Sequence, residues 1–352
     1  MMLDILQRSP IGTNSSESAA TAGTRISIWD GWRGIAILLV LCGHFVDILW
    51  IHEDRMGVDV FFVLSGMLMS IILFEKRISL RDFYIRRFSR IFPVLILLVV
   101  VMFSYSALAS IPFLISEIPA SLLFMRTYFP PSMSIWETQT STGHLWSLNV
   151  EEHAYMILSA ITLFMVNKKY IAIVLLSLAS TCIIISFFYS LNTTPEQFEL
   201  KSIRTESAAS FIFFSAGYGL LKRQYNWQLA PWFVLLCFGM AILCYVYKLP
   251  LHLRYGFAPI MLGVVVNHLD QIPTWFHRIL SLRIIGWFGI CSYSIYMWQQ
   301  VFFEYAWALP GERMTGLICA ITVGVACYYF FENPIRHSIN NRWSPKPVYK
   351  LK

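Results

Sequence analysis

An arginine and a histidine stand eleven residues apart on the first long apolar stretch of the chain. Eleven helical residues return to within about 20° of the starting direction, so Arg33 and His44 would point the same way, roughly 16 Å apart along the axis. Ionisable groups inside a bilayer are costly and usually functional. We therefore expect this helix face to line a channel. The alternative is a histidine satisfied between packed helices.

Two adjacent carboxylates form a second candidate site. Glu151 and Glu152 lie in the stretch from His144 to His153. On a helix that enters from the outer side they lie about two turns deep, the same depth as His44 on its own helix. A carboxylate that orients an imidazole and stabilises its protonated form makes the histidine a general base. Adjacent residues point about 100° apart, so we expect at most one glutamate to be the partner of His44.

A third candidate is a pair of arginines just before Pro93. Arg87 and Arg90 are three residues apart and therefore neighbours on one helix face. Paired guanidinium groups suit phosphate or pyrophosphate, which predicts an anionic ligand. The alternative is that both arginines anchor on lipid head groups at the membrane boundary.

Several common sites are missing from the sequence. It contains no Gly-rich phosphate loop, no HExxH pair and no paired CxxC spacing, so we expect no bound metal. Ser65 lacks the preceding glycine of a nucleophile elbow. The seven cysteines lie in apolar segments, and we expect them to be small core residues. Five further histidines at predicted helix ends or in loops are expected to be solvated: His52, His252, His268, His277 and His337.

The composition places these residues in a membrane protein. Of the 352 residues, 57% are hydrophobic and only 13% are charged, about half the charged fraction of a soluble domain. The net charge of +7 comes from basic residues between apolar runs, which indicates orientation in a bilayer rather than a nucleic-acid partner. The fold class predicted is all-α and integral to the membrane.

About ten transmembrane helices are predicted, because a span needs ~20 mostly apolar residues. The stretch 118–129 is short and precedes two prolines, so we read it as re-entrant or interfacial. The predicted spans are 35–51, 57–74, 91–111, 144–166, 169–190, 206–221, 229–247, 254–268, 284–306 and 314–331.

Basic residues also predict the orientation and the domain limits. With ten spans and the N-terminus inside, most Lys and Arg fall in the cytoplasm, as the positive-inside rule requires. We expect a polar cytoplasmic segment at 1–28, one transmembrane domain at 29–336 and a basic cytoplasmic tail at 337–352. The N-terminal segment lacks the apolar stretch of a cleavable signal peptide, so the first span should stay attached.

The motifs taken together resemble the acyltransferase-3 family of integral membrane O-acyltransferases, in its stand-alone form. The matching blocks run in order over residues 29–336. They are Asp30-Gly-Trp-Arg-Gly34 with His44, Gly57-Val-Asp-Val-Phe-Phe-Val-Leu-Ser-Gly66, Arg86-Arg-Phe-Ser-Arg-Ile-Phe-Pro93, His144-Leu-Trp-Ser-Leu-Asn-Val-Glu-Glu152, Ser292-Tyr-Ser-Ile-Tyr-Met-Trp298 and Phe331-Glu-Asn-Pro-Ile-Arg336.

The resemblance implies an enzyme that moves an acyl group, most often acetyl, from cytoplasmic acyl-coenzyme A to a hydroxyl of a carbohydrate such as a cell-surface or lipid-linked glycan. Acetyl-coenzyme A would be a co-substrate, with no tightly bound cofactor, and the location would be a bacterial inner membrane. Arg33, Arg87 and Arg90 would bind the donor, and His44 would deprotonate the acceptor with help from Glu151 or Glu152. Supporting roles would fall to Asp30, Asp59, Ser65, Trp146 and Tyr293.

The chain departs from the family pattern at a few positions. Asn149 replaces a common serine, His153 and Ala154 replace a glutamine and an aromatic residue, and Gln299 stands where histidine is frequent. We expect these changes to alter the acceptor pocket and not the central pair.

One mechanism fits both the residues and the resemblance. Coenzyme A phosphates would lie near Arg87 and Arg90, the pantetheine arm would follow the face shared by Arg33 and His44, and the acceptor would attack the thioester directly. An acyl group held first on a protein side chain is an alternative. A proton-coupled transporter using the same histidine and glutamates is the rival function, and a catalytically dead scaffold is a third.

Overall fold

The computed structural model describes residues 28–46, 50–131, 135–137 and 139–343. The predicted cytoplasmic segment at 1–28 and the last part of the predicted tail therefore lie almost entirely outside the described residues. Within these ranges the chain is helical and has no β-strand, apart from one isolated bridge between Ile51 and Val246. The all-α class is confirmed.

The elements follow one another with short connections. The first half of the chain forms α2 (Ile28–Phe45), α3 (Glu53–Met69), the π-helix η1 (Ser70–Glu75), α4 (Leu80–Leu108), α5 (Glu117–Leu122), the 3-10 turn η2 (Gly143–Leu145) and α6 (Trp146–Phe164). The second half forms α7 (Lys168–Asn192), α8 (Pro195–Ser202), α9 (Thr205–Ala208), α10 (Ser210–Tyr225), α11 (Pro231–Leu243), α12 (Leu251–Asn267), α13 (Thr274–Leu280), α14 (Arg283–Glu304), η3 (Ala306–Ala308), α15 (Glu312–Cys327), the π-helix η4 (Tyr328–Glu332) and α16 (Asn333–Trp343).

Helices α2 and α14 run parallel in direct backbone contact at the centre of the molecule. A Cβ on Gly34 would lie 1.9 Å from the carbonyl oxygen of Ile285, and one on Gly289 would lie 1.8 Å from that of Asp30. Only glycine permits so close an approach. We call the end of the bundle where α2 begins the Arg33 end, and the end where α2 finishes and α3 begins the His44 end.

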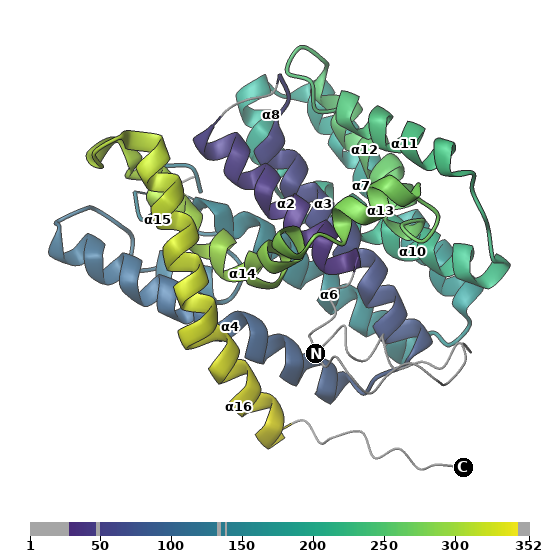
Figure 1. Cartoon of the computed structure of the whole chain (residues 1–352), viewed down its shortest axis with the longest axis horizontal. Coiled ribbons are helices and arrows are strands. Elements are labelled where there is room, and N and C mark those ends of the chain that lie inside the picture. Colours follow the sequence, from purple (N-terminus) through teal and green to yellow (C-terminus); the bar gives the residue numbers. More distant parts are fainter. Residues whose placement is uncertain (1–27, 47–49, 132–134, 138, 344–352) are drawn as a thin grey trace.

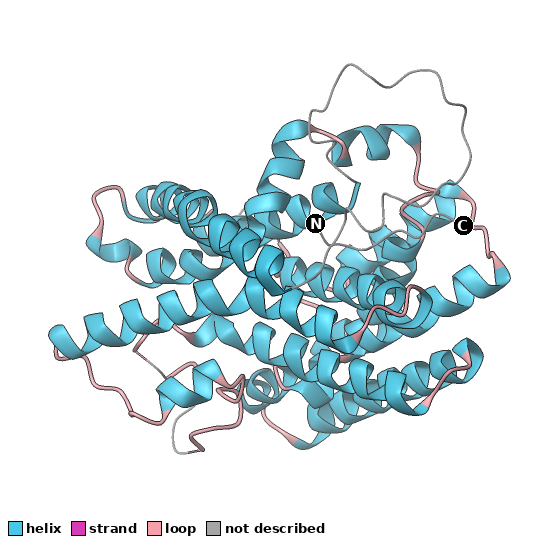
Figure 2. Cartoon of the chain, turned by 90° about the horizontal axis from the view of Figure 1, so that it is seen from below, coloured by secondary structure: helices cyan, strands magenta, loops and turns pink. Residues whose placement is uncertain are grey.

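The other helices pack around this pair in two groups (Figure 1). On one side α4 contacts α16, and α15 contacts α14. On the other side α10 packs between α7, α12 and α3, with α11 against α12. Figure 2 shows the long helices lying side by side with loops at their ends. Helix α3 joins the central pair to the second group, because it contacts both α2 and α10.

The predicted number of spans is not confirmed. A helix occupies most of each of the ten predicted stretches. Among the described residues, however, only five helices are long and apolar enough to cross a membrane, or six if α13 and α14, bent by 51° at their junction, are one broken span. The five are Ile28–Phe45, Glu53–Glu75, Leu80–Leu108, Lys168–Asn192 and Glu312–Trp343. Helices α10, α11 and α12 have 16, 13 and 17 residues, and at 1.5 Å per residue they reach only roughly 20–26 Å.

The structure also bears on the predictions for the stretch 118–129 and for His268. The stretch 118–129 contains only the six-residue α5 and turns, which confirms that it is too short to be a span. The prediction that His268 is solvated is wrong: its side chain is fully buried, and its Nε2 lies 2.8 Å from the hydroxyl of Tyr218. A polar side chain at a helix end is buried when a neighbouring helix supplies its partner.

Candidate functional site

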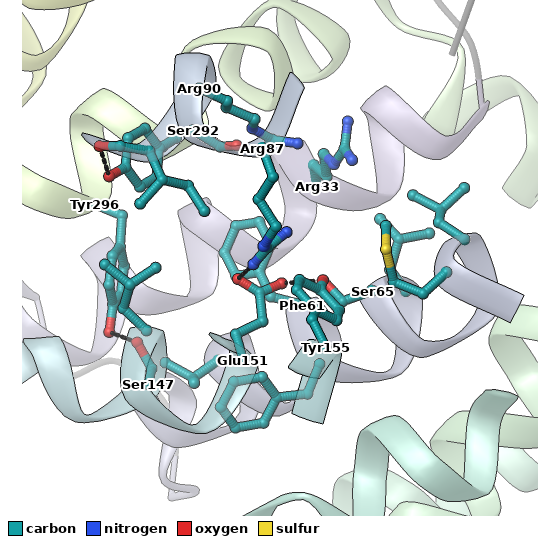
Figure 3. A pocket seen from close by; sticks show the side chains of 18 of the residues that line it. Arg33, Phe61, Ser65, Arg87, Arg90, Ser147, Glu151, Tyr155, Ser292 and Tyr296 are labelled. Atoms are coloured by element: carbon teal, nitrogen blue, oxygen red, sulfur yellow. Dashed lines mark hydrogen bonds and ion pairs between the residues drawn. The ribbon is translucent and has the colours of Figure 1, made fainter. Parts of the chain in front are cut away.

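A narrow cavity lies between α2, α3, α4, α6 and α14, and it collects most of the predicted site residues (Figure 3). Its volume is about 90 Å³, far below the roughly 300–1,000 Å³ of ordinary small-molecule sites. Such a space suits a small group or an extended chain rather than a whole nucleotide. Its polar lining comes from Arg33, Ser65, Arg87, Arg90, Ser147, Glu151, Tyr155, Ser292, Tyr293 and Tyr296.

Arg87 is the most tightly held cation in the cavity. Its Nε and Nη2 each lie 2.6 Å from Oε1 of Glu152, and Nη2 lies 3.4 Å from Oε2 of Glu151. The guanidinium carbon also lies 3.5 Å from the ring centre of Tyr155. A buried guanidinium is stable only with such partners, so the two glutamates and the tyrosine fix Arg87 against α6.

Glu151 joins three helices at the cavity wall. Its Oε1 accepts hydrogen bonds from the hydroxyls of Ser65 on α3 and of Tyr155, the latter at 2.6 Å. Its other oxygen faces Arg87 on α4. Ser65, which belongs to one of the blocks that resemble the family, therefore orients a carboxylate. Tyr155 has no motif of its own, and only its position one turn after Glu151 indicates that the two side chains can meet.

Arg33 and Arg90 complete the group of three predicted arginines, and all three line the same cavity. Arg33 lies 3.7 Å from the carboxylate of Asp30, one turn earlier on α2. Among the described residues no carboxylate lies within ion-pairing distance of Arg90. Within the part of the chain that the structure describes, the Arg33 end of the cavity thus keeps the positive charge of Arg90 without a carboxylate partner.

The opposite end of the cavity is closed by a tyrosine and a serine (Figure 3). The hydroxyl oxygens of Tyr296 on α14 and Ser147 on α6 lie 2.7 Å apart, and the Tyr296 hydroxyl donates to the carbonyl of His144 at 3.0 Å. Sequence reasoning missed both residues, because a tyrosine in an aromatic run has no pattern that distinguishes it from packing.

His44 lies beyond this closed end and is not among the residues that line the cavity. Its Nδ1 lies 2.5 Å from Oε1 of Gln299, its ring stacks on Phe303 with centres 4.6 Å apart, and its Nε2 lies 3.9 Å from a carboxylate oxygen of Asp54. On α14, Gln299 follows the cavity residue Met297 by two residues, a rise of about 3 Å.

These contacts correct two sequence predictions. Neither Glu151 nor Glu152 is the partner of His44, because both carboxylates bind Arg87 and equal depth on two helices does not fix the direction of a side chain. Gln299, which differs from the histidine frequent in the family, does not lie in a separate pocket. Its side chain forms the hydrogen bond with His44.

The remaining supporting residues lie around the cavity rather than in it, except for Tyr293, whose hydroxyl donates to the carbonyl of Ile91 at 2.8 Å. Asp59 is fully buried, 3.4 Å from Nε of Arg55, and accepts from the hydroxyl of Tyr245 at 2.9 Å. The Arg55 guanidinium covers the ring of Trp146 at 4.1 Å. This network joins the start of α3 to the start of α6.

The long segment between α4 and α6 is fixed to α9 through a tyrosine. The Tyr128 hydroxyl donates to Glu206 at 2.6 Å and accepts from the backbone N–H of Thr205 at 2.9 Å. Burial and the neighbouring carboxylate raise the pKa of Tyr128 to about 12. The contact therefore holds throughout the physiological pH range.

No metal site was found among the described residues, since no group of three or more His, Cys, Asp or Glu side chains could hold an ion. The charged groups of the cavity are arginines paired in part with glutamates. Guanidinium groups are the side chains best suited to hold an anionic ligand.

A family model described as an acyltransferase domain matches residues 26–332 of the chain. The chain is also similar to the peptidoglycan O-acetyltransferase OatA of Listeria monocytogenes, with 26% identity over 77% of the chain and 48% of the relative. A putative peptidoglycan O-acetyltransferase of Bacillus subtilis, YrhL, is 25% identical over 87% of the chain and 54% of the relative.

A putative O-acetyltransferase of Staphylococcus aureus is 23% identical over 91% of the chain and 59% of its own length. The chain thus spans about half the length of the curated relatives it matches. No solved structure matches it significantly. The match from residue 26 to residue 332 covers every residue of the cavity and the surroundings of His44.

Proposed function

Because the chain belongs to the acyltransferase-3 family, we propose that it is a membrane O-acetyltransferase that moves an acetyl group from acetyl-coenzyme A to a hydroxyl of a carbohydrate. The observation that carries the proposal is the convergence of Arg33, Arg87 and Arg90 on one narrow cavity, whose lining residue Met297 on α14 is two residues before Gln299, the partner of His44. A glycan of the cell surface, of the kind named for the relatives, is the first acceptor to test.

The donor would enter at the Arg33 end. Coenzyme A carries phosphates, which guanidinium groups bind well, and Arg90 has no carboxylate partner among the described residues to compete with them. The cavity is too small for the nucleotide, so the nucleotide would stay at the mouth while the thin pantetheine arm entered. The thioester would then point at Tyr296 and Ser147.

The acyl transfer would take place near His44. The acceptor hydroxyl gives its proton to the imidazole, its oxygen attacks the thioester carbonyl, the C–S bond breaks, and the proton passes to the departing thiolate of coenzyme A. Because Tyr296 and Ser147 close the cavity before His44, the Tyr296 side chain must move before the thioester can reach the base.

An acyl group held first on a protein side chain is the alternative route. Incubation with labelled acetyl-coenzyme A and no acceptor distinguishes the two. Direct transfer leaves no label on the protein, whereas an acyl-enzyme retains it.

The proposed orientation places both termini in the cytoplasm, with ten crossings and the Arg33 end facing inward. The distribution of Lys and Arg supports this orientation. Short helices such as α11 would cross within the bundle, where neighbouring helices cover their ends.

The direct test is acetyl transfer by purified protein in liposomes, with labelled acetyl-coenzyme A on one face and native glycans on the other. We expect label on glycan with the wild type and turnover lower by ~10²–10⁴-fold with His44→Ala, the usual contribution of a general base. His277→Ala, an exposed histidine on α13, is the control. Near-normal turnover with His44→Ala would refute the role of the base, and solute or ion flux without transfer would favour a transporter.

A further inference from the structure

Two glutamine side chains near the end of α14, Gln299 and Gln300, connect His44 to the carboxylate of Glu304. Gln299 Oε1 lies 2.5 Å from Nδ1 of His44, and Gln299 Nε2 lies 3.5 Å from Oε1 of Gln300. Gln300 Nε2 in turn donates to Oε1 of Glu304 at 2.7 Å. Gln299 is fully buried and Gln300 nearly so, which limits the access of water to the bond between them, whereas Glu304 is half-buried.

The carboxylate fixes the direction of each of these hydrogen bonds. An ionised Glu304 can only accept, so it orients the NH₂ group of Gln300 toward itself and leaves the Gln300 oxygen for Gln299. That oxygen accepts the NH₂ of Gln299, and the oxygen of Gln299 is left to face His44. An amide oxygen cannot donate, so Nδ1 of His44 must carry the proton.

The proton on Nδ1 leaves the lone pair of a neutral His44 on Nε2. This nitrogen is the one that faces the open side of the site, 3.9 Å from the partly exposed carboxylate of Asp54. The stacked ring of Phe303 limits rotation of the imidazole. When Nε2 takes up a proton, the Nδ1–H bond to Gln299 stays in place, so protonation needs no rearrangement.

We propose that Glu304, through Gln300 and Gln299, is a positioning residue that selects the Nδ1–H tautomer of His44 and so places the basic nitrogen toward the acceptor. This inference rests on the proposed function, because it assigns a task to residues that serve the same base. Glu304 touches neither substrate; it acts at a distance through two amides. Histidine is frequent in the family at position 299. The glutamine of this chain allows the Glu304 carboxylate to set the direction of the hydrogen bond between residue 299 and His44.

The kinetic test compares three variants in the acetyl-transfer assay. Glu304→Gln keeps the shape but can donate or accept, so it removes the fixed direction; Gln299→Leu removes the acceptor for His44. We expect kcat to fall in both while the KM for acetyl-coenzyme A stays unchanged, by roughly 10–100-fold for Gln299→Leu, the usual loss when the partner that orients a functional histidine is removed. Glu312→Gln, an exposed glutamate at the start of α15, should keep wild-type kcat.

The tautomer itself can be read by ¹⁵N NMR of histidine-labelled protein, with His44→Ala assigning the signals. The wild type should show a protonated Nδ1 and an unprotonated Nε2 on neutral His44, and Glu304→Gln should show a mixture of both forms. A protonated Nε2 in the wild type, or wild-type kcat in both variants, would overturn the relay. Loss of activity in His44→Ala alone would refute only the relay, whereas full activity of His44→Ala would remove the proposed base itself.

Discussion

The three arginines of the cavity differ in how many carboxylates compensate their charge. Two carboxylates and an aromatic face surround Arg87. Arg33 has one carboxylate partner, Asp30, whereas Arg90 lines the cavity without a carboxylate partner among the described residues. A buried ion pair with one partner removed leaves an uncompensated charge. The three arginines are thus expected to separate in their effects on folding and on donor binding.

Arg87→Ala should destabilise the protein, because it leaves Glu151 and Glu152 buried side by side without a cation. Removing one partner of such a pair costs roughly 3–5 kcal/mol. Thermal unfolding in detergent measures the loss. A variant that unfolds at the wild-type temperature would show that water, not Arg87, compensates the carboxylates.

Arg90→Ala should instead leave the unfolding temperature unchanged and raise the KM for acetyl-coenzyme A more than the KM for the acceptor. The reason is that Arg90 lines the cavity and, within the described ranges, has no carboxylate ion-pair partner to lose. Steady-state kinetics with each substrate varied in turn measure both constants. Arg278→Ala on the exposed side of α13 is the control, and a larger effect on the acceptor would place Arg90 on the acceptor side.

At this scale the sequence singles out charged residues within apolar helices, but it does not predict which atoms they contact. Buried charge is costly anywhere, so Arg33, His44 and Glu151 stand out from the composition around them. Their partners depend on how helices rotate against each other, which spacing along one helix cannot give. Gln299 and Tyr155 therefore become recognisable only when α14 and α6 are placed beside α2 and α4.

At the scale of the elements, the direct contact of α2 and α14 sets the distance between Arg33 and the α14 side of the cavity. Gly289 makes that contact possible, because a Cβ there would overlap the backbone of Asp30. A side chain on either helix would push the two apart. The cavity wall formed by Tyr293 and Tyr296 would then move away from Arg33.

Gly289→Ala should accordingly lower acetyl transfer by about 10²-fold, the cost of misplacing reacting groups by about 1 Å. Gly239→Ala is the matched control, because nothing lies within 4 Å of its Cβ on α11. The liposome assay with both variants tests this expectation. Equal activity would mean that α2 and α14 adjust without changing the site.

The presence of the helices was predictable from the apolar stretches. Whether each helix is long enough to cross a membrane was not. A helix lies in each predicted stretch, yet α10, α11 and α12 end after 16, 13 and 17 residues. Flanking loops such as the turn after Leu243 also carry apolar residues, so an apolar run overstates the length of its helix. The π-helices η1 and η4 have no sequence signal of this kind.

At the scale of the whole molecule, the surface carries large exposed apolar side chains on many helices, including Val100, Phe188 and Ile318. A soluble protein rarely exposes so many, and a lipid environment accounts for them. The loops that join the described helices then lie on the two faces where the helices end (Figure 2). Which face is cytoplasmic follows from the positive-inside rule and can be measured directly.

Single cysteines in a cysteine-free background measure the orientation. Trp50→Cys lies in the exposed connection before α3 at the His44 end, and Lys169→Cys lies at the exposed start of α7. With a membrane-impermeant maleimide on intact cells, we expect the first variant to be labelled and the second to react only after permeabilisation. The reverse result would place the Arg33 end outside and exclude a cytoplasmic donor at that end.

The hydroxyl contact between Tyr296 and Ser147 has a consequence for the energy supply of the cell. Under the proposed function, a donor from one face and an acceptor from the other would require a route across the bilayer, and an open route would let protons leak and dissipate the membrane potential. We expect the contact of Tyr296 with Ser147 and the His144 carbonyl to block this route at rest. Cells that express Tyr296→Ala should therefore lose membrane potential, measured with a voltage-sensitive dye, even where no acetyl group is transferred.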